Sequence, residues 1–135
     1  MSPNSAVLLN AQQGLPKPIS ARAHGIIDYS HAAFFLTMAL VCRKKNPAAA
    51  RAAAFTGSLV LAQSLLTDYP LGWKRVLPFA THGKLDAGFA AFSSLIPGMF
   101  GFSGTKMSAL FKGNTLVEAT VVALTDFDSE HARQG

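Results

Sequence analysis

A five-residue motif that occurs twice constrains this chain more than any other feature. His24-Gly25-Ile26-Ile27-Asp28 returns 58 residues later as His82-Gly83-Lys84-Leu85-Asp86. At the same offset, AAF over 32–34 and LTDY over 66–69 return as AAF and LTDF. Self-similarity at one fixed period indicates a tandem duplication, which changes the fold assignment if it is missed. The sequence therefore predicts two copies of one structural unit.

The distribution of charge indicates that these units lie in a membrane. Half of the residues are hydrophobic and only 14% are charged, against about 25% in an ordinary soluble domain. No charged residue occurs in 29–42, 52–67 or 87–105, and 113–125 contains only Glu118. These windows are shorter than the roughly 20 residues of a spanning helix, so each helix must extend into its flanking aspartates.

The expected fold is all-α: an integral membrane four-helix bundle built from two tandem helical hairpins. Four spanning helices are predicted, over about 23–42, 48–68, 82–100 and 107–126. They form a single transmembrane domain over 21–127, with repeat 1 over about 22–70 and repeat 2 over about 80–127. A polar arm over 1–20 and a polar tail over 128–135 flank this domain. The repeats are expected to run parallel, related by an axis along the membrane normal.

This topology predicts a polar cluster at one end of the bundle. Both HGxxD motifs begin a helix on the side where the termini lie, and Asp68 and Asp126 end helices on that same side. The four helices are thus expected to bring six side chains together: His24, Asp28, Asp68, His82, Asp86 and Asp126.

Three interpretations of the cluster remain open. In the favoured one, the histidines donate to aspartates of neighbouring helices, so that every polar group in the bilayer is satisfied. In the second, the cluster binds a metal ion, because imidazole and carboxylate together suit zinc, iron or manganese. In the third, His24 and His82 ligate a haem or a chlorophyll-type pigment from two sides. The favoured interpretation predicts no cofactor and no catalytic residue.

A second polar pair is expected deeper in the bundle. Glu118 lies eight residues inside the last helix from Asp126, and His31 lies seven residues inside the first helix from His24. The two therefore occupy about the same depth. An intramembrane carboxylate is a functional candidate, but a hydrogen bond between His31 and Glu118 that links the two repeats is the favoured interpretation over a proton relay.

The repeated motifs resemble a known family. HGIIDY at 24–29, LTDYPLGWKRVLP at 66–78, the second HGKLD and IPGMFGF at 96–102 are similar to small bacterial four-helix membrane proteins related to the SPW-repeat family. The Ser-Pro-Trp tripeptide itself is not intact, because Pro97 stands between Ile96 and Gly98. The resemblance implies a four-helix membrane fold and no particular activity.

Together these features predict a small structural or accessory subunit of a membrane assembly, with lipid and other membrane subunits or a second copy as partners. The alternatives are a metal, haem or pigment redox protein that uses His24 and His82, and a proton-coupled carrier that uses Glu118 and His31. The basic residues are scattered in short loops, so no nucleic acid is expected. The expected location is the bacterial cytoplasmic membrane, with the His/Asp face on the non-cytoplasmic side.

Overall fold

The computed structural model describes residues 16–128. The predicted polar arm and polar tail lie outside the described residues, apart from 16–20 and Asp128. Five α-helices occur in the described part, which confirms the all-α prediction: α2 (Ala21–Cys42), α3 (Pro47–Leu66), α4 (Phe79–Ser93), α5 (Ile96–Phe100) and α6 (Lys106–Leu124).

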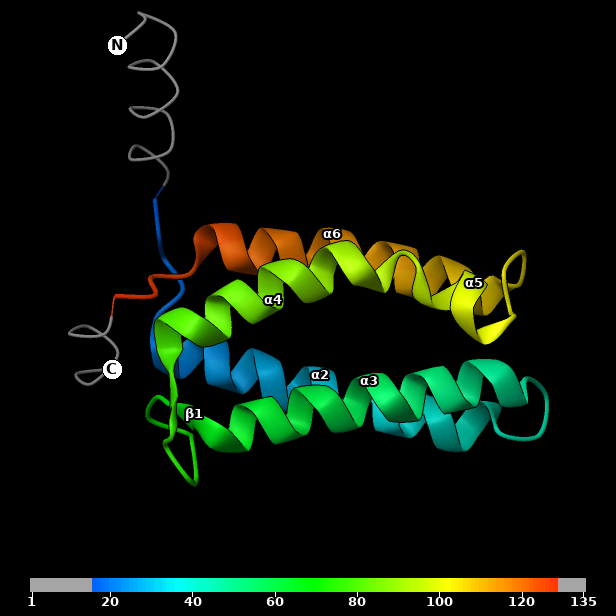
Figure 1. The fold of residues 1–135 in the computed structure, drawn as a ribbon, viewed down its shortest axis with the longest axis horizontal. Coiled ribbons are helices and arrows are strands. Elements are labelled where there is room, and N and C mark those ends of the chain that lie inside the picture. Colours follow the sequence, from blue (N-terminus) through cyan, green and yellow to red (C-terminus); the bar gives the residue numbers. More distant parts are fainter. Residues whose placement is uncertain (1–15, 129–135) are drawn as a thin grey trace, which may run out of the picture.

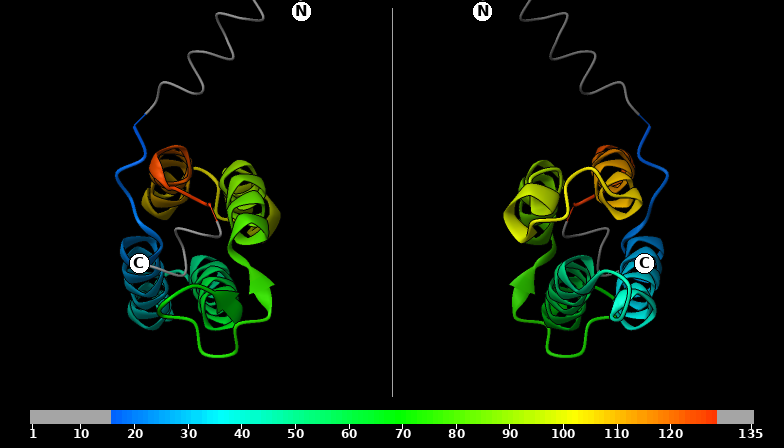
Figure 2. Two further views of the ribbon diagram at one scale, coloured as in Figure 1. Left: turned by 90° about the vertical axis from the view of Figure 1, so that its left-hand side faces the viewer. Right: turned by 90° about the vertical axis from the view of Figure 1, so that its right-hand side faces the viewer.

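The four longer helices lie side by side (Figure 1). Helices α2 and α3 form one antiparallel hairpin and pack closely along their length, and α4 and α6 form the second. In the end-on views, α2 lies beside α6 and α3 beside α4 (Figure 2). Two helices are long and apolar enough to cross a membrane, α2 with 22 residues and α3 with 20. At 1.5 Å per residue these lengths are about 33 and 30 Å.

Capping residues set where the first hairpin's helices begin. The Ser20 side chain accepts a hydrogen bond from the amide of Ala23 at the start of α2. The Asn46 side chain accepts from the amide of Ala49, and Pro47 occupies the first position of α3. Such side chains satisfy backbone donors that have no partner within the helix, and proline is well suited to the first helical position.

Two predicted helix boundaries are corrected. The helix expected over 82–100 is interrupted after Ser93, and α5 begins at Ile96. Pro97 explains the break, because its ring clashes with the carbonyl four residues earlier, which is that of Ser93. Helix α4 also begins at Phe79, so His82 lies in the first turns of its helix rather than at the very start.

Short extended segments tie the hairpins together. Strand β1 (Thr67–Asp68) pairs in parallel with β2 (Leu77–Pro78). An isolated parallel bridge joins Ile19 to Thr125. Ile19 stands 58 residues before Leu77, and Thr125 stands 58 residues after Thr67. This is the same offset that separates the two HGxxD motifs. Equivalent segments of the two sequence copies therefore make equivalent pairings.

Apolar packing is concentrated at the two ends of the bundle. At the end near α5, the core contains Phe35 of α2, Ala52 of α3, Ile96 of α5 and Phe111 of α6. At the opposite end, Tyr69 and Phe79 pack with Ala21. The middle section between these clusters contains a cavity, described below.

Candidate metal centre

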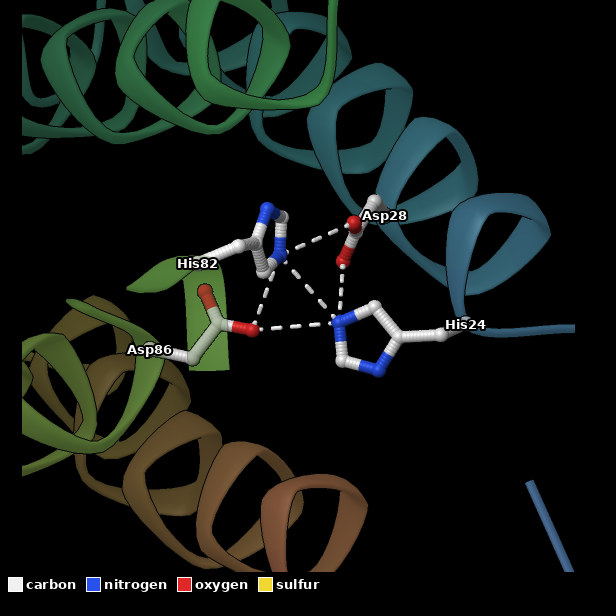
Figure 3. Close-up of side chains that lie close together, drawn as sticks. All are labelled: His24, Asp28, His82 and Asp86. Carbon is white, nitrogen blue, oxygen red and sulfur yellow. Dashed lines mark hydrogen bonds and ion pairs between the residues drawn. The ribbon is translucent and has the colours of Figure 1, made fainter. Parts of the chain in front are cut away.

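Four polar side chains converge at the end of the bundle where α2 and α4 begin. His24 and Asp28 come from α2, and His82 and Asp86 come from α4 (Figure 3). Within each helix the histidine and the aspartate are four residues apart, which places both on one face. One ligand atom from each of the four lies within 4.8 Å of the others. The structure thus brings together four of the six residues expected in the polar cluster.

The distances between these atoms are short and nearly uniform. The Nε2 atoms of His24 and His82 lie 3.2 Å apart. Asp28 places Oδ1 3.3 Å from the His24 nitrogen and Oδ2 3.3 Å from that of His82. The Asp86 Oδ2 atom lies 3.1 Å from the His24 nitrogen and 3.0 Å from that of His82. Two imidazole nitrogens and two carboxylates therefore surround one point between the helices.

Two threonines hold the far side of the histidine rings. His24 Nδ1 lies 2.9 Å from the Thr125 hydroxyl, and His82 Nδ1 lies 2.7 Å from the Thr67 hydroxyl. Both threonines are fully buried at the C-terminal ends of α6 and α3. Each histidine is therefore oriented by the hairpin to which it does not belong.

The threonines also determine which ring nitrogen carries a proton. Each hydroxyl lies 2.6 Å from the carbonyl four residues earlier, that of Gln63 for Thr67 and that of Val121 for Thr125. A carbonyl only accepts, so each hydroxyl donates to it and must accept from the ring. Nδ1–H is then the donor in both histidines. The two Nε2 atoms are left facing each other and the carboxylates.

Different neighbours support the two carboxylates. The Tyr69 hydroxyl donates to Asp28 over 3.1 Å, and the Gln63 amide donates to Asp86 over 2.7 Å. Burial, and next the charge of Asp28, raises the pKa of the Tyr69 hydroxyl above its ordinary value. Tyr69 therefore remains a proton donor. Phe127 stands where the second repeat would carry the equivalent tyrosine, so the two halves of the site differ.

Aromatic rings separate the centre from the end of the bundle. Phe79 and Phe127 each meet the His24 ring edge-on, with centroids 5.4 Å apart. The Tyr69 ring lies 5.8 Å from that of His82. His24 is 0% exposed and His82 1%. The nitrogens therefore face the carboxylates in surroundings from which water is largely excluded.

The other two aspartates expected in the cluster, Asp68 and Asp126, lie outside this group of four. The chain is extended where α3 and α6 end, at Thr67 and Thr125. Successive side chains of an extended chain point in opposite directions, so the buried threonines turn inward and the aspartates that follow do not. The repeated LTD motif did mark the site, but through its threonine.

The expected pair of His31 and Glu118 is present with an additional partner. His31 Nδ1 lies 3.5 Å from Glu118 Oε1. Asn114 contacts both residues, because its Oδ1 bonds His31 Nε2 and its Nδ2 donates to Glu118 Oε1 over 3.3 Å. Sequence spacing did not indicate Asn114. Its equivalent in the first repeat is Thr56, a buried residue whose hydroxyl oxygen has no hydrogen-bond partner in the described structure.

A cavity of about 350 Å³ lies between the two hairpins and connects these polar groups. Asp28 and Asp86 border it at one end, and His31 and Glu118 lie further along. Most of the remaining wall is apolar, with residues from all four long helices, including Ile27, Leu59, Phe89 and Val121. The carboxylates of the four-residue centre are thus accessible from inside the bundle.

Comparison with known proteins found no match. No protein-family model, no curated protein and no solved structure matches this chain. The geometry of the site therefore carries the proposed function.

Proposed function

We propose that this chain is a small metal-binding membrane protein in which His24, Asp28, His82 and Asp86 hold one divalent first-row transition-metal ion. The observation that carries the proposal is the pair of histidines whose Nδ1–H groups are both engaged by threonines. This leaves both Nε2 atoms directed at two carboxylates. Metal-bound histidines characteristically donate their second N–H to a carboxylate, a backbone carbonyl or water, and here the threonine hydroxyls serve as the acceptors.

The spacing of the four donor groups supports a tetrahedral ion. Zinc–nitrogen and zinc–oxygen distances are about 2.0–2.1 Å, so the ligands of a tetrahedral site lie about 3.3 Å from one another. The contacts between the histidine nitrogens and the carboxylates measure 3.0–3.3 Å. Two imidazoles with two carboxylates suit Zn²⁺, Fe²⁺ or Mn²⁺.

A purely structural cluster has a less favourable arrangement. If both Nε2 atoms carried protons, two N–H groups 3.2 Å apart would point at each other. If neither did, two lone pairs and two carboxylates would face one another in a buried site, which is costly. If only one did, its N–H could donate to the other nitrogen or to a carboxylate, but one cation would face two carboxylates and leave a buried net negative charge. A divalent cation balances the two carboxylates and accepts all four donors. The short separation of the nitrogens also leaves no room for the plane of a macrocycle between them, which favours an ion over a haem or pigment.

The membrane setting is part of the proposal. Helices α2 and α3 have the length and composition of spans, and we propose that α4 and α6 complete a four-span bundle of duplicated hairpins in the bacterial cytoplasmic membrane. Large apolar side chains exposed on all four helices support this placement: Ile26, Phe34, Leu40, Val41, Phe55, Leu59, Leu85, Leu110, Leu116 and Val117. The accessory-subunit role and the resemblance to SPW-repeat proteins stay predictions.

Metal analysis of the purified protein tests the proposal. We expect about one metal ion per chain by mass spectrometry after purification without chelator. His24→Ala and His82→Ala should each abolish stoichiometric binding, because each removes one of the two imidazole ligands and leaves only three donor groups.

Two matched variants distinguish the centre from other polar groups of the bundle. His31→Ala removes a histidine outside the four-residue centre, and Asp68→Asn removes an aspartate outside it. Both should retain the metal. One result would refute the metal centre and favour the structural interpretation. In that result, the parent protein contains much less than one metal ion per chain, and neither histidine variant shows a further decrease.

A further inference from the structure

The cavity between the hairpins has the properties of a small-molecule site. Its volume of about 350 Å³ falls at the lower end of the range of ligand pockets, about 300–1,000 Å³. A cavity of about 150 Å³ already accommodates benzene. The space therefore suits one aromatic ring with a short alkyl chain.

The cavity is lined by an acidic group, Glu118, that has one carboxyl oxygen without a hydrogen-bond partner. Glu118 is 8% exposed, and its Oε2 atom has no hydrogen-bond partner in the described structure. Its other oxygen is held by Asn114 and lies near His31. A buried carboxyl oxygen without a partner is costly unless another group satisfies it.

The charges that line the cavity have one sign. Asp28, Asp86 and Glu118 are acidic, and none of the described lining residues is lysine or arginine. A divalent ion at the four-residue centre would offset the two aspartates but not Glu118. Most of the remaining wall is apolar and includes Phe89, whose ring can contact an alkyl chain or a cation over its face.

We infer that this cavity binds a lipophilic amine, with its nitrogen at the Glu118 carboxyl group and its apolar body among the surrounding aliphatic and aromatic side chains. An amine suits Glu118 in either protonation state, because an ammonium donates to a carboxylate and a neutral amine accepts from a carboxylic acid. The complex carries no net charge in both cases. A neutral alcohol of the same shape would fill the same space but form no ion pair.

The openings of the cavity are suited to such a ligand. Ile26 on α2, Leu59 on α3 and Val117 on α6 line the cavity and are also 54%, 41% and 56% exposed. The mouth is therefore apolar and lies along the flanks of the bundle. In the proposed membrane placement these flanks face lipid, from which a lipophilic amine can enter.

A pair of isosteric ligands tests the inference on the unmodified protein. Tritiated 4-phenylbutylamine would be bound to the full chain in detergent, in a scintillation proximity assay, and displaced by unlabelled 4-phenylbutylamine or by 4-phenyl-1-butanol. We expect saturable binding, with the amine displacing the label at a concentration about tenfold or more below that of the alcohol, equivalent to at least about 1.4 kcal/mol. Equal potency, or binding that does not saturate, would overturn the inference.

Variants then locate the bound amine. Glu118→Gln keeps the size of the side chain and should lose about tenfold in affinity for the amine with little change for the alcohol. Val60→Phe places a ring in the cavity wall and should abolish binding of both ligands. Val41→Phe makes the same change at a residue of α2 that is 66% exposed, and should bind normally. Unchanged binding by Val60→Phe would also overturn the inference.

The test separates this inference from the proposed metal centre. The assay is run after chelation and again after one equivalent of Zn²⁺, because the amine contacts Glu118, which is not one of the four ligands. Amine binding by a protein that does not bind the added Zn²⁺ would uphold the inference and refute the metal proposal. A protein that binds one metal ion per chain but no amine would uphold the metal proposal and refute the inference about the cavity.

Discussion

At the scale of single residues, two threonine hydroxyls decide how the histidines are presented. Thr67 and Thr125 each donate to a helix carbonyl and accept from a histidine Nδ1. They touch neither a carboxylate nor the point between the ligands, so they are positioning residues. Their effect is to hold each ring with Nε2 directed inward.

Removal of one hydroxyl tests this role. Thr125→Val keeps the branched shape and leaves His24 Nδ1–H without an acceptor. We expect metal affinity, measured by competition with a chelator of known affinity, to fall about 10- to 100-fold. The stoichiometry at saturating metal should remain one ion per chain, because all four ligands are retained.

Thr56→Val provides a matched control for the same chemical change. Thr56 is 0% exposed and its hydroxyl oxygen has no partner in the described structure. Loss of an unsatisfied buried hydroxyl should leave metal affinity unchanged and keep or raise the melting temperature. Equal loss of metal affinity in Thr125→Val and Thr56→Val would show that packing, rather than the hydrogen bond, supports the site.

At the scale of elements, the first hairpin depends on a close approach of backbones at Gly57. A Cβ atom added there would lie 2.8 Å from Leu36 Cγ, 3.0 Å from Leu36 N and 3.1 Å from the Ala32 carbonyl oxygen. Two of these atoms belong to the backbone of α2, so they cannot move aside without moving the helix. Small residues at such crossings let helices pack closely where lipid provides no hydrophobic drive.

Two glycine-to-alanine changes test the packing of this hairpin. Gly57→Ala should lower the free energy of unfolding by about 1–3 kcal/mol through overpacking. Gly88→Ala lies in α4 with no atom within 4 Å of the added Cβ and should raise it by about 0.5–1 kcal/mol, because alanine favours helix over glycine. Unfolding in mixed detergent micelles measures both. A Gly57→Ala variant as stable as the parent would contradict the close approach of α2 and α3.

At the scale of the whole molecule, the two hairpins meet mainly at their ends. The four-residue centre and the paired segments join them at one end, and the apolar cluster around Ile96 and Phe111 joins them at the other. The cavity occupies the section between. This arrangement leaves an internal site within a small bundle, at the cost of less contact between the hairpins.

The proposed membrane placement makes a prediction about topology. Ile19 pairs with Thr125, so both ends of the described chain lie at the end that carries the His/Asp centre (Figure 1). We expect the protein to resist carbonate extraction from bacterial membranes. Reporter fusions to the two termini should give the same location, the non-cytoplasmic side. Release into the soluble fraction, or reporters on opposite sides, would refute the four-span bundle.

The sequence by itself determined the helical class, the approximate positions of the helices and the two His/Asp pairs of the four-residue centre, because these are local properties. A histidine and an aspartate four residues apart share a helix face wherever the helix is placed. Equal distances along adjacent helices imply equal depth, which is why the sequence also predicts that His31 lies near Glu118. The break before α5 is also a local property, since the ring of Pro97 clashes with the carbonyl four residues earlier.

Only the tertiary structure decided which side chains complete the centre. Thr125 is 101 residues from His24, and Tyr69 is 41 residues from Asp28. Such contacts depend on which helix neighbours which, and on the direction in which the chain leaves α3 and α6. One residue of difference in an extended segment reverses the direction of a side chain. That reversal is why the buried threonines reach the histidines, while Asp68 and Asp126 lie outside the centre.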